Sequence, residues 1–428
     1  MSGRPLLRLP IRQTFKQAFQ PTRRIHTAPK RPQFQTRSNP IHNGQKRFKG
    51  SFAENAQKLF RENPVSVSLA IVAMIGGVTG IVYANIIYQE YIIKSFHKYP
   101  EEVAKKLRRA LYYTNYDLNP QEALKYYKQA LQVASEIGMD PVGDEIMGVK
   151  IQVAKLMEDI EQYPNAIHIL EAVRGSNLLW LEKFGSLPEN KERRTKVLGK
   201  TVGVSVKLGE LYGTPEVWDR DMAQERLVWA VETVLKEKQR RENANVKDED
   251  EGPWMNDEEI GATLESLAHS YEAKDQHYLA APLFLQALAL QPTKDCHTIV
   301  LMSNVASSLA QQSPRMAREA QAYATSQNIN TRPSGPAATR ETMLENAKTW
   351  AQKALDVAAT IKPPVRTEEC DIGCAVALHN LGEFAEMAKD PDSAKRQYQE
   401  AISLARAIGF EEGVAQSSER LRALSSSG

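Results

Sequence analysis

The chain has 428 residues, of which 25% are charged and 42% hydrophobic, and this composition is typical of a soluble globular or repeat protein long enough for two or more domains. Residues 1–64 hold 14 of the 55 Lys and Arg and 2 of the 52 Asp and Glu, so the other 364 residues carry 41 basic and 50 acidic side chains, a net charge of −9. A body of that sign excludes nucleic-acid binding by the usual basic surface.

The N-terminal segment is basic and amphipathic. Residues 1–53 contain 12 Lys or Arg and no acid. Basic side chains recur at Arg4, Arg8, Arg12 and Lys16, and apolar ones at Leu7, Ile11, Phe15 and Phe19. Because residues four apart share a helical face, the two sets lie on different faces, as in mitochondrial transit peptides. We therefore predict a disordered targeting presequence over residues 1–50, in preference to a basic tail that binds nucleic acid or an anionic membrane surface.

The next element is an apolar run. Residues 65–88, VSVSLAIVAMIGGVTGIVYANIIY, carry no charge over 24 positions. A helix of that length spans roughly 36 Å, which exceeds a hydrocarbon core of about 30 Å. A buried core helix is seldom apolar on every face, and the apolar region of a signal peptide is shorter and nearer the N-terminus. The sequence therefore predicts one transmembrane helix.

This helix contains a small-residue motif. Gly76 and Gly80 form GxxxG, with Ala73 and Gly77 alongside. Such a face lets another helix approach closely, although glycine is also frequent in membrane helices for other reasons. The motif therefore has two interpretations, a packing face for a membrane partner or the ordinary glycine content of a membrane helix.

The flanks of the span do not give its orientation. The twenty residues on each side contain five Lys or Arg. If the presequence draws the N-terminus into the mitochondrial matrix and the span stops in the inner membrane, the body lies in the intermembrane space.

Beyond residue 100 the pattern is helical and repeats itself. Two segments match position by position. The first has Leu267, Ala268, Tyr271, Ala280, Phe284, Ala287 and Pro292; the second has Leu381, Gly382, Ala385, Ala394, Tyr398 and Ala401, with Arg406 in place of the proline. The spacing resembles the tetratricopeptide repeat (TPR), a 34-residue helix-turn-helix unit. Small residues let the two helices approach, and large ones fill the space between successive hairpins.

Four weaker matches extend the array. They rest on Ala123, Tyr127 and Ala130; on Ala154, Ala166 and Leu170; on Leu208, Gly209, Tyr212, Ala223, Leu227 and Ala230; and on Ala347 and Ala354. The predicted fold is an all-α TPR superhelix over residues 100–410. Its six degenerate repeats lie near 104–137, 147–180, 202–237, 261–294, 299–361 (with a long insertion) and 375–408.

The charged segment 236–259 is expected to loop out between the third and fourth repeats, and residues 411–428 are expected to form a frayed C-terminal tail.

Cys370 and Cys374 form a CxxxC pair that an oxidising compartment could join, although buried thiols are the commoner case. Cys296 has no evident partner in the sequence.

No catalytic or metal-binding motif occurs in the sequence. The eight histidines are scattered, and neither HExxH nor a P-loop is present. We therefore expect no enzyme activity, no cofactor, no metal and no small-molecule substrate.

The concave face of a TPR array is its usual binding surface, and its first helices present positions 2, 5, 9 and 12 there. In this chain those positions include Glu210, Glu265, His269, Glu272, His379, Glu383 and Glu386. They predict an acidic client groove over the C-terminal half, the alternative being an ordinary solvated face.

A transit peptide, one span and about six degenerate repeats together resemble the repeat-containing adaptor of the fungal mitochondrial i-AAA protease. The resemblance implies a single-pass inner-membrane protein with its repeats in the intermembrane space. Its partners would be the i-AAA protease complex and unfolded or misassembled membrane-protein clients, which it would deliver for degradation. A related animal TPR protein supports assembly and turnover of respiratory complex III, and that role is the first alternative. An outer-membrane import receptor is the second.

Overall fold

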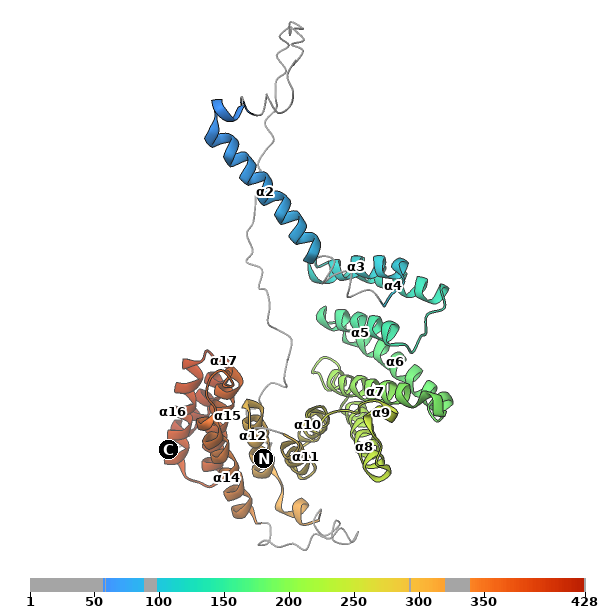
Figure 1. Cartoon of the computed structure of the whole chain (residues 1–428). Coiled ribbons are helices and arrows are strands. Elements are labelled where there is room, and N and C mark those ends of the chain that lie inside the picture. The colour runs from blue at the N-terminus through green and yellow to red at the C-terminus, as the bar shows by residue number, and fades with distance from the viewer. Residues whose placement is uncertain (1–56, 58, 88–97, 292–293, 320–338, 427–428) are drawn as a thin grey trace. The chain divides into compact units, whose positions relative to one another are not determined.

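The computed structural model describes residues 57, 59–87, 98–291, 294–319 and 339–426 (Figure 1). The predicted presequence, residues 1–50, lies outside the described residues. The chain divides into two units, one of which contains helix α2 and the other most of the helical array from Lys105 onward. Helices and turns make up the described residues, with no strand among them.

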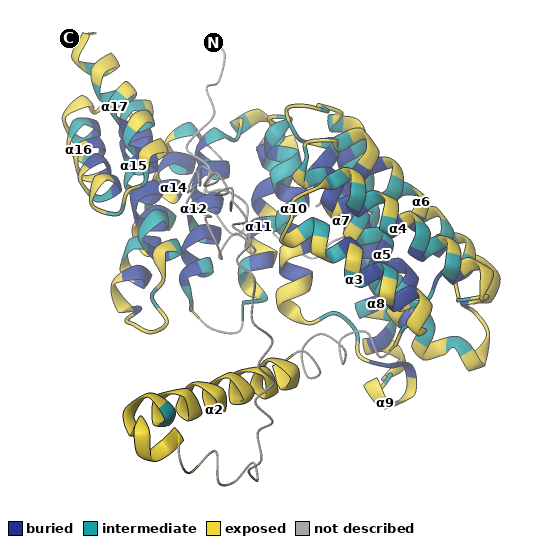
Figure 2. Cartoon of the chain, turned by 90° about the horizontal axis from the view of Figure 1, so that it is seen from above, coloured by how far each residue is buried: buried dark blue, intermediate teal, exposed yellow. Residues whose placement is uncertain are grey.

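Helix α2, Pro64–Ile87, coincides with the predicted span. It contains no charged residue, and none of its side chains is buried within the chain. Figure 2 shows most of α2 as exposed. An uncharged, mainly apolar helix with exposed side chains is unfavourable in water and stable in a bilayer. α2 is therefore a candidate transmembrane helix by length, composition and exposure.

The array consists of antiparallel helix pairs. Its members are α3 (Glu101–Asn115) with α4 (Pro120–Glu136), α5 (Asp144–Asp159) with α6 (Tyr163–Phe184), α7 (Lys191–Tyr212) with α8 (Arg220–Ala244), α10 (Asp257–Ala273) with α11 (His277–Ala289), α12 (Cys296–Gln311) with α14 (Arg340–Thr360), and α15 (Glu368–Met387) with α16 (Pro391–Ala407). Each second helix from α6 to α14 also packs on the first helix of the next pair. The array is the predicted all-α TPR fold.

Small residues make this packing possible. Ala268, Ala280 and Ala287 are fully buried where α10 meets α11. Phe284 and Tyr398 occupy equivalent positions in two repeats, and both side chains are fully buried. Because small residues bring the helices together and a large ring fills the remaining space, each repeat is stable only when stacked on its neighbours.

The turn inside a repeat recurs with the same backbone. Glu161, Asp275 and Lys389 each follow a first helix by two residues and have φ of 60°, 59° and 63°. One residue later the N–H donates to a carbonyl at the helix end; the Gln162 to Met157 bond is 2.7 Å long. This left-handed turn with a 6→1 bond ends a helix abruptly and sets the angle at which the next one returns.

The charged segment 236–259 does not loop out, contrary to the sequence prediction. α8 continues to Ala244, and α9 (Asp248–Glu251) packs against α7. The carboxylate of Glu237 accepts bonds from Arg194, Arg240 and Arg241. Burial alone would raise the pKa of Glu237, but these guanidinium groups lower it to about 2. Charge here holds the third repeat together instead of solvating a linker.

The chain end also differs from the predicted tail. Residues Glu411–Ser426 form helix α17, which packs on α16 and α15. α17 buries Gly413 and Ser417 and leaves the charged Glu411, Glu412 and Arg422 exposed. A terminal helix with a polar outer face caps a repeat array against water.

Candidate functional site

The predicted groove residues of α10 belong to a chain of ionisable side chains that crosses three helices. Glu265, His269 and Glu272 lie on one face of α10, and α11 packs against both α10 and α12. His297 of α12 places Nε2 3.0 Å from Glu265 Oε2. Its Nδ1 lies 3.2 Å from Oε1 of Glu369 in α15. The groove residues therefore connect neighbouring repeats.

Each of the two imidazoles lies between two carboxylates. His269 Nδ1 is 3.1 Å from Glu272 Oε2, and its Nε2 is 3.6 Å from Glu265 Oε1. Burial lowers the pKa of His269 and of His297, but the hydrogen bonds and charges of Glu265, Glu272 and Glu369 outweigh it. The pKa rises to about 9 for His269 and to about 10 for His297. Both rings are therefore protonated at neutral pH.

Glu265, which lies between the two imidazoles, is correspondingly held ionised. Burial raises the pKa of Glu265, but hydrogen bonds from His269 and His297 lower it to about 2. Glu272 accepts a 2.7 Å bond from Ser308 Oγ. The side chains of Glu265 and Glu272 are only 14% and 3% exposed. These acids mainly join helices and present little surface to a ligand.

In α15 the predicted residues face the capping helix α17. His379 Nδ1 lies 2.8 Å from Ser417 Oγ. Arg420 of α17 approaches Glu383 at 3.7 Å and also binds Glu386. The sequence does not reveal these contacts, because the local composition of residues 411–428 does not show that they form a helix packed on α15 and α16.

Glu210 lies apart from the other predicted groove residues. Lys207 Nζ is 3.3 Å from Glu210 Oε2 and 2.8 Å from Glu158 Oε1. Burial raises the pKa of Glu210, and the neighbouring Lys207 partly offsets this. Its side chain is 32% exposed, which makes it the most accessible of the predicted groove acids.

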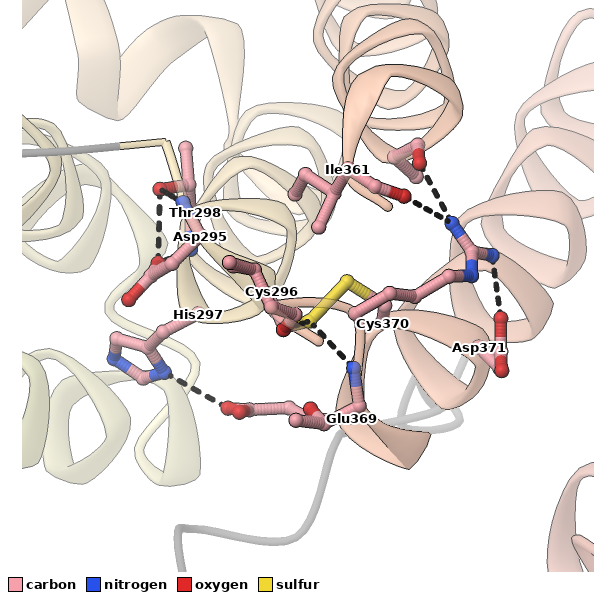
Figure 3. Close-up of a disulfide and its surroundings, with 12 residues drawn as sticks. Asp295, Cys296, His297, Thr298, Ile361, Glu369, Cys370 and Asp371 are labelled. Atoms are coloured by element: carbon pink, nitrogen blue, oxygen red, sulfur yellow. Dashed lines mark hydrogen bonds and ion pairs between the residues drawn. A yellow bond between two sulfur atoms is a disulfide. The ribbon is translucent and has the colours of Figure 1, made fainter. Parts of the chain in front are cut away.

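A disulfide joins the last two repeats (Figure 3). It links Cys296, the first residue of α12, to Cys370 in the first turn of α15, across a sequence separation of 74. Cys374 is a buried free thiol. Both sequence-based interpretations of Cys370 are therefore wrong, since it is neither a free thiol nor paired with Cys374. The partner of Cys370 could not be found from local spacing, because it lies beyond the long insertion.

The disulfide lies beside the ionic chain. His297 and Glu369, which are bonded to each other, are the sequence neighbours of Cys296 and Cys370. Figure 3 shows the His297–Glu369 contact next to the sulfur–sulfur bond. Covalent and ionic links thus join the N-terminal ends of α12 and α15 at one place.

The four residues predicted as a packing face, Ala73, Gly76, Gly77 and Gly80, are all exposed in α2. A methyl group added at any of the three glycines would meet no atom within 4 Å. Within the described part of the chain, nothing covers this face.

The side chains described do not form a metal centre. Among these residues, no group of three or more His, Cys, Asp or Glu is arranged to hold an ion. The paired His and Glu side chains described above bind one another.

Comparison with known proteins supports the fold and gives no activity. No family model matches the chain. A TPR repeat-containing protein of Schizosaccharomyces pombe is 26% identical over 322 residues, covering 74% of this chain and 76% of that protein.

Two solved structures are similar at low identity. The C-terminal part of a TPR repeat-containing protein from Cytophaga hutchinsonii is 13% identical and covers 82% of this chain and 94% of its own, with a TM-score of 0.37. A putative kinesin light chain with TPR-like repeats from Podospora anserina is 16% identical and covers 60% and 97%, with a TM-score of 0.35. The helix-pair geometry and the yeast relative support a protein built of tetratricopeptide repeats, the usual scaffold for protein–protein contacts.

Proposed function

We propose that this chain is a membrane-anchored, non-enzymatic adaptor of mitochondrial protein quality control. In this proposal α2 fixes the chain in the inner membrane. The array binds unfolded or misassembled inner-membrane proteins and delivers them to the i-AAA protease. One observation carries the proposal: a 24-residue apolar helix with no buried residue shares its chain with a repeat array. Such a chain holds a binding surface at a membrane.

The disulfide supports the proposed side of the membrane. Disulfides persist in oxidising compartments and are rare where glutathione keeps thiols reduced. The Cys296–Cys370 bond is therefore expected in a compartment such as the intermembrane space. That location agrees with a presequence that draws the N-terminus into the matrix.

We place the client contacts at the more accessible acids of the groove. Glu210 and Glu386 have side chains that are 32% and 19% exposed. Of the remaining predicted groove residues, Glu265, Glu272, His379 and Glu383 contact neighbouring helices, whereas His269 pairs with Glu265 and Glu272 inside α10. Together they shape the surface. Weak contacts spread over several repeats suit promiscuous capture of clients.

Affinity purification of the tagged full chain from mitochondria tests the adaptor role. Recovery of the i-AAA protease is the expected result. Recovery of complex III subunits without the protease would instead support the assembly and turnover role.

The membrane contact has its own matched variants. Gly76→Leu with Gly80→Leu fills the uncovered face of α2 and should reduce protease recovery at least about tenfold, because bulky side chains prevent close helix packing. Val78→Leu with Val82→Leu changes another face and should leave recovery unchanged. Equal protease recovery with the glycine and the valine variants would show that Gly76 and Gly80 do not contact the protease.

A further inference from the structure

The sulfur atoms of the disulfide are sealed inside the protein. Cys296 is 4% exposed and Cys370 is fully buried. Both lie in an apolar cluster with Ile299 and Ile361. Thiol–disulfide exchange requires a thiolate to reach a sulfur atom, and this cluster leaves no approach for one.

Polar contacts surround the Cys296–Cys370 disulfide where α12, α14 and α15 meet. The Thr367 N–H donates to Cys296 Sγ at 3.4 Å. Arg366 donates to the Ala358 carbonyl at 2.7 Å and pairs with Asp371 (Figure 3). The Thr367–Cys296 contact requires α12 and the start of α15 to be in place, and the Arg366 contacts connect the end of α14 to the start of α15.

Cys374 competes with Cys296 for pairing with Cys370 in the unfolded chain, and it is protected from reaction in the folded chain. Cys374 is four residues from Cys370, whereas Cys296 is 74 residues away. In an unfolded chain near neighbours meet far more often. In the folded chain Cys374 is 8% exposed, and burial raises the pKa of its thiol, so little thiolate is present.

We infer that the Cys296–Cys370 disulfide is formed on the incompletely folded chain by exchange with an external disulfide, and that closure of the last two repeats then seals it permanently. One cysteine thiolate attacks the donor disulfide, forming a mixed disulfide and releasing one donor thiolate. The other cysteine thiolate attacks the mixed disulfide at the chain's own sulfur and releases the second donor thiolate.

The overall reaction is balanced. The two cysteines lose two protons and two electrons, and the donor disulfide becomes a dithiol or two thiols. A thiol-oxidising reaction must therefore act on this chain during its folding. The bond is therefore a structural link and does not act as a redox switch in the folded protein. This inference concerns how the chain matures and does not depend on the proposed adaptor role.

Reduction of the oxidised full chain in detergent tests the inference. Dithiothreitol is added to the folded chain and, in parallel, to the chain in urea, and thiols are counted by their gel shift with a maleimide-polyethylene glycol. The denatured chain should pass from one thiol to three. The folded chain should do so more than about 100-fold more slowly, because only locally opened molecules react. Similar rates would overturn the inference, because the sulfurs would then be accessible in the folded state.

A refolding experiment examines the forward reaction. The reduced chain is refolded with oxidised glutathione present from the start or added after helical circular dichroism has returned. We expect the native pair with early oxidant and more than about 100-fold slower oxidation with late oxidant. A reduced chain that regains its helices only after oxidant is added also supports oxidation before closure. Fast oxidation of a chain that has already folded contradicts it.

The same experiment with Cys374→Ser removes the competing thiol. Early oxidation should then give the native pair without a mispaired intermediate. A mispaired Cys370–Cys374 form trapped from the wild-type chain would confirm the competition, and its absence would limit the role of Cys374 to packing. Because only the purified chain is used, either result leaves the adaptor proposal to its own test.

Discussion

At the scale of single residues, the imidazoles of His269 and His297 make the folded chain less stable as the pH becomes alkaline. The pKa values of His269 and His297 rise from 6.5 to about 9 and about 10 on folding. The folded chain therefore binds these protons more tightly than the unfolded chain. The resulting stability is full below pH about 6.5 and is lost as the pH rises through 9 and 10.

We predict that the urea midpoint of the full chain falls between pH 7 and pH 10. His269→Gln with His297→Gln should lower the midpoint at pH 7 and flatten this decline, because neither ring is then present to lose its proton. His168→Gln, at an exposed position on α6, should leave the decline intact. An equally steep decline in the double variant would show that other groups cause it.

Two glycines of one helix give a second residue-scale prediction. A Cβ at Gly209 of α7 would clash with Leu227, which is 3% exposed and cannot move away. Gly209→Ala should therefore destabilise the array by about 1–3 kcal/mol. At Gly203 of the same helix a Cβ meets no atom within 4 Å, so Gly203→Ala should stabilise it by about 0.5–1 kcal/mol. Urea unfolding followed by circular dichroism measures both, and the reverse order would refute the packing explanation.

At the scale of helices, the disulfide acts on the last two repeats. It closes a loop that contains α14 and the long insertion, with a sequence separation of 74. The chain-entropy model gives about 4–5 kcal/mol for a loop of that size, reduced by whatever structure the unfolded chain retains.

Cys296→Ser should therefore lower the urea midpoint and speed amide hydrogen exchange in α12, α14 and α15. Exchange in α3–α8 should stay unchanged, because repeats contact only their neighbours. Cys374→Ser, which leaves the disulfide in place, is the matched control. Uniformly faster exchange along the array after Cys296→Ser would mean that the repeats unfold as one unit.

The sequence predicted the helices better than the contacts between them. Small residues such as Ala268 and Gly382 mark the repeats because the helix-pair geometry requires them locally. Segment 236–259 looked like a solvated linker because its composition does not show that Arg241 and Glu237 bury each other.

The groove and the disulfide show the same limit. Glu265 and Glu383 stand at positions that predict a concave face, but His297 and Arg420, their partners, come from other helices. Cys296 and Cys370 meet only after the insertion has been spanned. Contacts between distant segments depend on the assembled array, which no local pattern specifies.

At the scale of the whole molecule, the chain joins an uncharged apolar helix to a highly charged repeat array. α2 has no charge and no buried residue. The 364 residues from 65 onward carry a net charge of −9. A charged array cannot enter a bilayer, so in the proposed arrangement, with α2 spanning the membrane, the whole array lies on one side. The proposed function depends on which side that is.

Protease protection of a C-terminally tagged full chain in isolated mitochondria measures this most directly. We predict that the tag is protected in intact organelles and digested after the outer membrane is ruptured, which places the array in the intermembrane space. Digestion in intact organelles would favour the outer-membrane import receptor. Protection after rupture would place the array in the matrix and contradict both the adaptor and the complex III proposals.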